Sequence, residues 1–182
     1  MLVVTEESFL KELLENNINI NNIPDMLVDF LKKHGVKIAT AESCTGGLIS
    51  KKITDISGAS DVFDCGVCSY SNEIKSKVLG VDKNVLNTLG AVSGETAIQM
   101  AQGVRKLADS YIGVSTTGIA GPTGSTAEKP VGLVYIGVAI ENNSYAVKAL
   151  LAENKTNNRE KIRQLAASCA LYIVYKQIIN TI

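Results

Sequence analysis

Apolar residues along this chain follow two patterns, which alternate from the N-terminal to the C-terminal end. Helical spacing of apolar residues, bounded by caps and stops, predicts helices over 24–34, 47–56, 72–79, 83–89 and 93–108. A last helix is predicted to open at Thr156 or Asn157, with an apolar side formed by Ile162, Leu165, Cys169 and Ile173. Short apolar runs predict strands over 36–41, 62–70 and 111–117, and a hairpin of 131–140 with 144–151 across 141–143.

Strands alternate with helices for most of the length, which is typical of the α/β class. We therefore expect a three-layer α/β/α sandwich around a mixed, mostly parallel sheet, with the antiparallel pair late in the chain. The stretch from Gly118 to Pro130 holds three Gly and two Pro and is predicted to be a loop.

The first 21 residues differ in pattern from the rest of the chain. The pairs Phe9/Leu13 and Leu10/Leu14, each at i,i+4, predict a short amphipathic helix, and residues 16–22 consist of five Asn and two Ile. We interpret 16–22 as a linker, 1–21 as a short N-terminal extension and 22–182 as one domain. The apolar stripe of the extension could dock on its own domain or on a partner subunit, and we expect a homo-oligomer, with a dimer favoured.

Composition narrows the function classes. The 182 residues are 46% hydrophobic, enough for one full-sized core, and 18 basic residues balance 18 acidic ones. Basic residues do not cluster with aromatic ones, which argues against nucleic-acid binding. No apolar run approaches the roughly 20 residues that span a bilayer, and charged residues stand at positions 6, 7 and 11 where a signal peptide needs an apolar stretch. We expect a soluble cytoplasmic protein with no membrane partner. Its reduced thiols would be Cys44, Cys65, Cys68 and Cys169.

The segment from Ala39 to Gly47 is the first candidate for chemistry. Three nucleophile-capable side chains, Ser43, Cys44 and Thr45, precede two glycines between a predicted strand and a predicted helix. Unpaired N–H groups at such a helix start suit an anionic ligand or a developing oxyanion. Neighbours alternate at a strand end, so Ser43 and Cys44 should face opposite ways and one of them should be buried. Either could be the nucleophile at this stage.

The choice of base is restricted by the histidine count. His34 is the only histidine, and it follows two lysines at a predicted helix end, where a positive charge is favourable. A Ser-His-Asp or Cys-His arrangement is therefore nearly excluded. Cys65 and Cys68 have C-x-x-C spacing, but residues three apart on a strand point to opposite faces and cannot share a metal there. Both are interpreted as core or strand cysteines.

Two further features of the sequence indicate a site that binds an anionic ligand. Gly118, Gly121 and the next glycine at 124 do not match a known phosphate loop, yet a Gly-rich turn after a strand lets backbone N–H groups approach a ligand. A plain loop is the alternative. Arg159 and Arg163 lie four apart near the start of the last helix, where cations are disfavoured. They are placed either for an anion such as phosphate or as a solvated pair.

Five motifs in this order resemble those of the CinA C-terminal domain family. They are Thr40–Gly47, Tyr70–Lys75, Gly90–Ser93, Gly118–Pro122 and Lys129–Gly132. The resemblance runs from about residue 24 to 178. It implies a stand-alone form of the domain that needs no metal and no cofactor. The enzymatic members of the family are nicotinamide mononucleotide deamidases, so the implied substrate is a small mononucleotide.

The resemblance also implies roles for individual residues. Ser43 would attack the carboxamide and form an acyl-enzyme, Lys75 would act as the base, and Tyr70 would orient the pair. The implied substrate-binding residues are Thr45, Gly46, Gly47, Thr117, Gly118, Gly121 and Arg159. The family usually has a glycine just before this arginine, whereas Asn157 and Asn158 stand here. The alternative is a regulatory module that binds a nucleotide or phosphate without catalysis.

Overall fold

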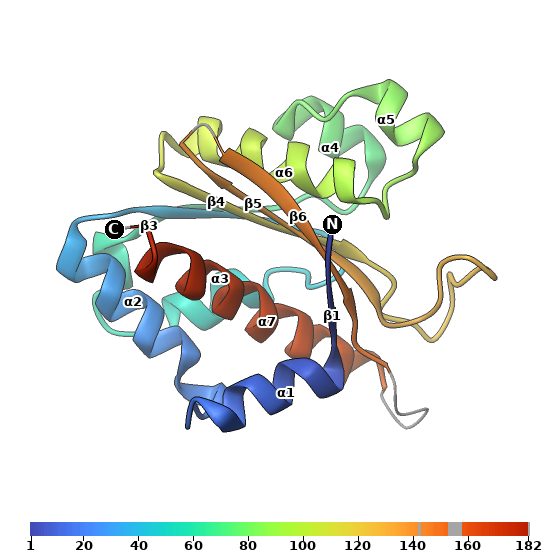
Figure 1. The fold of residues 1–182 in the computed structure, drawn as a ribbon. Helices are drawn as coiled ribbons and strands as arrows, with labels where there is room; N and C mark the ends of the chain where they lie inside the picture. Colours follow the sequence, from blue (N-terminus) through green and yellow to red (C-terminus); the bar gives the residue numbers. More distant parts are fainter. Residues whose placement is uncertain (142, 153–157, 182) are drawn as a thin grey trace.

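The computed structural model describes residues 1–141, 143–152 and 158–181. They form an α/β fold around one six-stranded mixed sheet with the order β1-β6-β5-β4-β2-β3 (Figure 1). The strands are β1 (Leu2–Thr5), β2 (Ile38–Glu42), β3 (Phe63–Cys68), β4 (Ile112–Gly118), β5 (Leu133–Ile140) and β6 (Asn143–Leu150). The pairs β1–β6, β2–β3 and β2–β4 are parallel, and β4–β5–β6 is an antiparallel run. The predicted mixed, mostly parallel sheet is confirmed.

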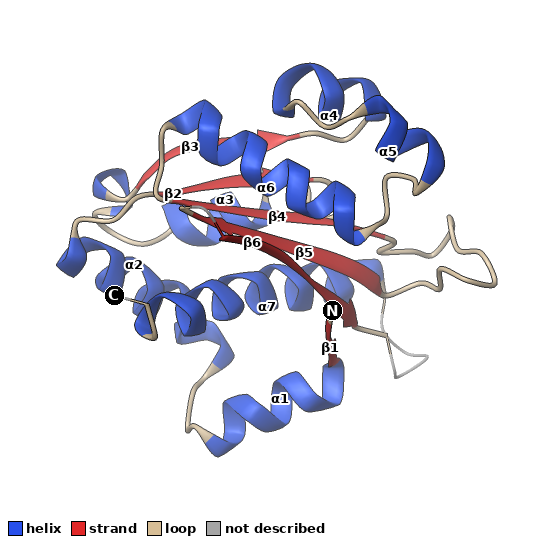
Figure 2. Cartoon of the chain, turned by 45° about the horizontal axis from the view of Figure 1, so that its top comes forward, coloured by secondary structure: helices blue, strands red, loops and turns tan. Residues whose placement is uncertain are grey.

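Helices cover both faces of this sheet and make the predicted three layers (Figure 2). One side carries α4 (Asn72–Leu79), α5 (Lys83–Thr88) and α6 (Gly94–Ala108). The other side carries α1 (Glu6–Glu15), α2 (Ile23–His34), α3 (Leu48–Thr54) and α7 (Arg159–Ile179). Short 3-10 turns occupy Ile20–Asn22 and Ala59–Asp61. Each helix that the apolar spacing predicts is present.

Helix ends follow the local capping chemistry. Gly35 ends α2 with φ of 63°, a left-handed conformation that glycine adopts without strain. Ser93 caps α6 by accepting a hydrogen bond from the Thr96 N–H, as the sequence predicts. Helix α7 is described from Arg159, with Asn158 as its cap, while Thr156 and Asn157 lie outside the described residues. The hairpin is antiparallel up to the pair Ile140–Asn143, next to residue 142, which is also outside them.

The N-terminal segment joins the fold in a way that the sequence did not predict. Strand β1 pairs with β6 in parallel, with Leu2 beside Val147, and extends the sheet at one edge. In α1, Phe9 and Leu13 are buried with 1% and 3% exposure, whereas Leu14 is 80% exposed. The apolar stripe therefore docks on its own domain through Phe9 and Leu13, and residues 16–22, the predicted linker, include a 3-10 turn.

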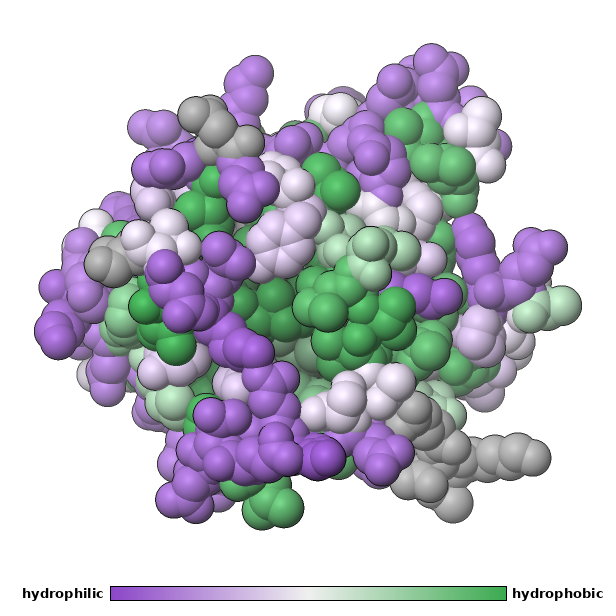
Figure 3. All heavy atoms as spheres, viewed as in Figure 1, coloured by the Kyte–Doolittle hydropathy of each residue, from purple (hydrophilic) through white to green (hydrophobic). Residues whose placement is uncertain are grey.

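Apolar surface gathers over β1 in the space-filling view, near the centre of the face seen in Figure 3. Leu2 is 64% exposed there and Val3 is 52% exposed. Within the described part of the chain, no helix has the length and apolar character needed to cross a membrane.

Candidate active site

The site lies where three neighbouring parallel strands end. Glu42, at the end of β2, is in register with Cys68 of β3 and with Thr116 of β4. The first residue after β2 is Ser43, whose N–H donates to the Thr116 carbonyl at 2.9 Å. Ligands bind outside the carboxyl ends of strands in open α/β sheets. The arrangement of β2, β3 and β4 therefore places Ser43 at a position suited to chemistry.

A lysine from another element reaches Ser43. Lys75 lies in α4, and its Nζ is 3.0 Å from Ser43 Oγ, although 32 positions separate the two residues. The same Nζ donates to the Ser69 carbonyl at 2.7 Å and to the Tyr70 carbonyl at 3.4 Å. The structure thus brings together Ser43, Lys75 and the backbone of Tyr70, the three residues predicted to be catalytic.

Burial changes the acidity of the lysine. The Lys75 residue is 1% exposed, and desolvation by burial lowers the pKa of its ammonium below the ordinary 10.5. A neutral amine has two N–H groups and one lone pair. Two carbonyl oxygens, of Ser69 and Tyr70, are in place for the N–H groups, which leaves the lone pair for the Ser43 hydroxyl. The surroundings of Lys75 therefore suit a general base.

The Cys44 side chain is buried in the core. It is 7% exposed and belongs to the same apolar cluster as Leu165 and Cys169 of α7. Burial raises the pKa of the Cys44 thiol to about 12, so almost none of it is thiolate at neutral pH. Strand alternation predicted that Ser43 and Cys44 face opposite ways, and the structure confirms it. The hypothesis that Cys44 is the nucleophile loses its physical basis.

The buried carboxylate of Glu42 organises the turn after β2, a role that sequence reasoning missed. Its Oε2 accepts from the N–H groups of Gly47 and Ile49, each at 3.0 Å. Its Oε1 accepts from the Ser50 N–H at 2.8 Å and from the Ser50 hydroxyl at 2.7 Å. An acidic residue close to a predicted helix start was the available signal. Because Glu42 occupies these donors, the Gly47 N–H is not available for a ligand.

Thr45 is fixed by side-chain and backbone contacts. Its Oγ1 lies 2.7 Å from Thr116 Oγ1, and the residue has no exposed surface. Its carbonyl accepts a hydrogen bond from Arg163 Nη2 at 2.7 Å. The Thr45 hydroxyl is thus committed to the protein, and Arg163 of α7 contacts the nucleophile turn directly.

Arg159 connects two other predicted residues. Its Nη1 donates to the Gly121 carbonyl at 2.8 Å, and its Nη2 lies 3.2 Å from the Tyr70 hydroxyl. Tyr70 is 70% exposed, so its phenol lies at the surface with Arg159 and not in the Lys75 environment. Thr117, 1% exposed, donates to the Ala91 carbonyl at 2.7 Å.

Gly118 occupies a position that only glycine fits. A Cβ built on Gly118 would lie 2.5 Å from the Leu133 carbonyl oxygen, so any side chain would collide with the backbone of the neighbouring strand. The close contact of Gly118 is therefore with the neighbouring strand β5 of the same sheet.

Other candidate residues lie elsewhere. His34 contacts the Phe30 carbonyl at 2.8 Å at the end of α2, as its capping interpretation predicts. On β3, Cys65 packs against the cluster beneath α6, whereas Cys68 is exposed and its Sγ lies beside Gly47. The two thiols therefore point to opposite faces. The described residues contain no group of three His, Cys, Asp or Glu that could hold a metal ion.

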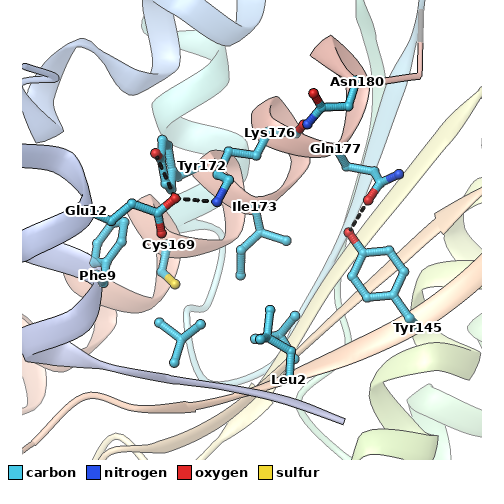
Figure 4. A pocket seen from close by; sticks show the side chains of 12 residues that line it. Leu2, Phe9, Glu12, Tyr145, Cys169, Tyr172, Ile173, Lys176, Gln177 and Asn180 are labelled. Carbon is cyan, nitrogen blue, oxygen red and sulfur yellow. Dashed lines mark hydrogen bonds and ion pairs between the residues drawn. The ribbon is translucent and has the colours of Figure 1, made fainter. Parts of the chain in front are cut away.

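A cavity of about 230 Å³ lies between β1, β6, α1 and α7, remote from Ser43 (Figure 4). Apolar side chains such as Leu2, Phe9 and Ile173 line it. At its rim Glu12 accepts from the Tyr172 hydroxyl at 3.3 Å and pairs with Lys176. No predicted site residue lines this cavity.

Comparison with known proteins identifies the family. The family model described as the CinA C-terminal domain matches residues 20–178. A relative from Thermoanaerobacter sp. strain X514, which carries the name competence-damage inducible protein, is 51% identical over 163 residues, or 90% of this chain and 38% of its own length. A CinA-like protein of Kosmotoga olearia is 51% identical over 158 residues, 87% of this chain and 37% of its own.

Solved structures show the same fold. The competence/damage inducible protein CihA from Agrobacterium tumefaciens superposes with a TM-score of 0.82 at 38% identity, covering 86% of this chain and 94% of that one. A CinA superfamily protein from Klebsiella pneumoniae 700603 superposes with a TM-score of 0.83 at 25% identity, covering 89% and 99%. This chain spans less than two fifths of the length of the two sequence relatives but nearly all of the two structures.

Proposed function

The chain belongs to the CinA C-terminal domain family, and on that premise we propose that it is an amidohydrolase acting on nicotinamide mononucleotide. The reaction converts the carboxamide to the carboxylate, giving nicotinate mononucleotide and ammonia. It recycles a pyridine nucleotide. The observation that carries this proposal is the 3.0 Å contact between Lys75 Nζ and Ser43 Oγ in a buried environment.

Acylation begins with a proton transfer. Neutral Lys75 takes the proton of the Ser43 hydroxyl while Oγ attacks the carboxamide carbon. The resulting ammonium keeps its hydrogen bonds to the Ser69 and Tyr70 carbonyls, which stabilise the charge in a buried site. Lys75 then gives the proton to the departing nitrogen, so ammonia leaves and an ester on Ser43 remains. One group thus serves as base and then as acid.

Deacylation repeats the same steps with water. Lys75, neutral again, takes a proton from a water molecule that attacks the ester carbon. Collapse of the second tetrahedral intermediate returns the proton to Ser43 Oγ and releases the nicotinate product. Because one base serves both half-reactions, the single histidine of the chain, at the end of α2, is not needed.

Substrate binding is assigned to the mouth of the site. The Arg159 guanidinium can accept a phosphate in bidentate geometry once it leaves the Gly121 carbonyl. Tyr70, exposed and beside Arg159, offers a ring and a hydroxyl to the same ligand. The turn around Gly118 and Gly121 completes the proposed nucleotide pocket, and Thr117, whose buried hydroxyl donates to the Ala91 carbonyl, fixes the start of that turn. The substrate is a small molecule, and the mechanism uses no metal and no cofactor.

The proposal is tested by incubating the purified chain with nicotinamide mononucleotide and measuring ammonia and nicotinate mononucleotide. Ser43→Ala should abolish both products, because no other hydroxyl contacts Lys75 Nζ among the described residues. Mass spectrometry of a rapidly quenched wild-type reaction should detect an acyl group on the peptide that contains Ser43. Ser43→Ala should keep the wild-type unfolding midpoint, which shows that the loss is chemical.

Two outcomes would contradict the proposal. Undiminished ammonia release by Ser43→Ala would remove Ser43 as the nucleophile. Calorimetric binding of nicotinamide mononucleotide by the wild-type chain without any ammonia release would favour the alternative, a module that binds the nucleotide without catalysis.

A further inference from the structure

Attack by Ser43 on a carboxamide creates an oxyanion, and the structure limits which groups can stabilise it. Helix starts commonly supply such donors. Here the N–H groups of Gly47, Ile49 and Ser50 already donate to the Glu42 carboxylate, which is 1% exposed. These three N–H groups are therefore not available to an oxyanion, and the next N–H along the chain toward Ser43 is that of Gly46. The Gly46 N–H has no acceptor within the described ranges 1–141, 143–152 and 158–181.

The orientation of the Gly46 N–H is set by the peptide bond that it shares with Thr45. In a trans peptide the C=O and N–H groups point in opposite directions. The Thr45 carbonyl points to α7, where Arg163 Nη2 donates to it at 2.7 Å. The Gly46 N–H consequently points away from α7. Helices α3 and α7 lie on one side of the sheet, whereas the Ser43 hydroxyl contacts Lys75 of α4, on the other side.

We propose that Arg163 is a positioning residue that directs the Gly46 N–H toward the oxyanion formed when Ser43 attacks. This inference rests on the proposed amidase function and adds to it a specific donor and the residue that aims it. Arg163 touches neither the carboxamide nor Lys75 and acts only through the Thr45–Gly46 peptide. Its other guanidinium nitrogen, Nη1, lies 3.2 Å from Oε2 of the exposed Glu160 on the same helix.

Arg163 also strengthens this donor electronically. A cationic donor on a carbonyl polarises the whole peptide group, and hydrogen bonds in such chains reinforce one another. Polarisation of the Thr45 carbonyl makes the Gly46 N–H more acidic and a better partner for an oxyanion. Gly46 has φ of 61°, and a Cβ there would lie 3.4 Å from Arg163 Nη2. Glycine therefore permits both the turn and the close approach of the guanidinium.

Steady-state kinetics with two substrates test the proposal. Arg163→Ala should lower kcat by about 10- to 100-fold for both nicotinamide mononucleotide and nicotinamide riboside, part of the effect of removing an oxyanion donor. KM for each substrate should change little, because the hydrogen bond from the Gly46 N–H to the oxyanion forms only in the transition state. Arg159→Ala, one turn away, should instead raise KM for the phosphorylated substrate. Arg163→Lys should recover part of kcat, and added guanidinium should partly rescue Arg163→Ala.

Glu160→Ala provides the matched control. It removes the ion pair of Arg163 with a side chain that is 61% exposed and leaves the Thr45 contact, so kcat should stay within about twofold of wild type. An Arg163→Ala variant with wild-type kcat would overturn the proposal. So would an increase in KM confined to the phosphorylated substrate, which would make Arg163 a phosphate ligand. Unfolding midpoints of all variants show whether any loss reflects folding.

An activity-independent measurement separates this inference from the proposed function. In a 15N-labelled chain, Arg163→Ala should shift the Gly46 amide proton upfield, with Arg163→Lys in between, because the peptide loses polarisation. An unshifted Gly46 resonance would overturn the inference whether or not the chain releases ammonia. If the wild-type chain releases no ammonia while the resonance shifts, the amidase function fails, whereas the polarisation of the Thr45–Gly46 peptide by Arg163 stands.

Discussion

At the scale of single residues, the buried lysine is the feature that links stability to chemistry. Desolvation lowers the pKa of Lys75 below 10.5, so the folded protein holds more of the neutral amine than an exposed lysine would. We expect kcat/KM to rise with pH as Lys75 loses its proton, with a midpoint below 10.5. A pH profile of ammonia release measures this limb. Lys75→Arg should be inactive at every pH, because a guanidinium keeps its proton.

The same shift makes a prediction for stability. Between the lowered pKa and 10.5, the unfolded chain binds more protons at Lys75 than the folded chain does. The free energy of unfolding should therefore increase with pH over that interval, relative to Lys75→Met, which cannot titrate there. Urea denaturation at several pH values gives both curves. If the two proteins showed the same pH dependence of the free energy of unfolding, the pKa of Lys75 would not be lowered in the folded state.

Cys44 provides a prediction about the neighbouring nucleophile. Burial raises the pKa of its thiol to about 12, and its side chain lies in the core beneath α7. Cys44→Ala should keep kcat close to wild type, since Lys75 Nζ bonds to Ser43, Ser69 and Tyr70 and the raised pKa of the buried thiol keeps it protonated at neutral pH. It should lower the free energy of unfolding by about 1 kcal/mol, as expected for a small buried side chain. A large loss of kcat in a folded Cys44→Ala variant would restore the thiol hypothesis.

Glu42 provides a prediction about preorganisation. Replacing it by Ala leaves the N–H groups of Gly47, Ile49 and Ser50 without their acceptor in a buried site. Loss of such a network should lower the free energy of unfolding by roughly 3–5 kcal/mol, measured by urea denaturation. The free energy of unfolding of Glu42→Gln should fall between those of the wild type and Glu42→Ala. The Gln amide keeps one oxygen acceptor but turns an NH2 group toward the remaining N–H donors. A variant as stable as wild type would show that water replaces the carboxylate.

The sequence predicted some of these residues and not others, for physical reasons. The opposite orientations of Ser43 and Cys44 follow from strand alternation, a local property. The contact of Arg163 with Thr45 spans 118 positions, and no local pattern contains it. The role of Lys75 came only from the resemblance to a family, because a lysine in a short helix is otherwise ordinary and its burial is a tertiary property.

At the scale of elements, α4 must be held in place for Lys75 to reach Ser43. Helix α6 supports it: a Cβ on Gly103 of α6 would lie 1.9 Å from the carbonyl oxygen of Leu79, the last residue of α4. Gly103→Ala should therefore displace α4, lengthen the Lys75–Ser43 contact and lower kcat by at least tenfold, since small misplacements of catalytic groups are costly. Kinetics and a structure of the variant measure both effects.

Gly80→Ala, at the end of α4, is the matched control for Gly103→Ala. A Cβ on Gly80 meets nothing within 4 Å, so only its φ of 69° is strained and α4 need not move. Its unfolding free energy should fall by about 1 kcal/mol or somewhat more, with kcat largely kept. Equal kcat losses in the two variants would mean that backbone strain, and not the displacement of α4, decides activity.

The spacing of apolar residues was sufficient to predict the helices but not every strand. Helix α4 has the predicted bounds, because a cap at Ser71 and the glycine at 80 mark both ends locally. Strand β1 was not predicted, because its four residues are too few to show a period. They become a strand only through pairing with β6, about 145 positions later in the chain (147 − 2 = 145). Pairing at that separation cannot be read from a local window.

At the scale of the whole molecule, the N-terminal segment and the active site occupy different parts of the fold. Phe9 packs against Tyr172 of α7, with ring centroids 5.8 Å apart, beside the cavity of Figure 4. Ser43 follows the end of β2 and Lys75 lies in α4, which follows β3, while β1 is at the opposite edge of the sheet from β3. The predicted dimer stays a prediction. Leu10 and Leu14 remain exposed on the outer side of α1.

This separation predicts that stability and catalysis can be changed independently. Phe9→Ala removes a large side chain that is 1% exposed and should lower the free energy of unfolding by about 3–5 kcal/mol. Leu14→Ala, on the same helix but 80% exposed, should change it by less than about 0.5 kcal/mol. Both should keep the wild-type kcat below their unfolding midpoints. If Phe9→Ala lost kcat while fully folded, α1 would have to influence β2 or α4 through α7, a helix that contacts both the N-terminal segment and the turn after β2.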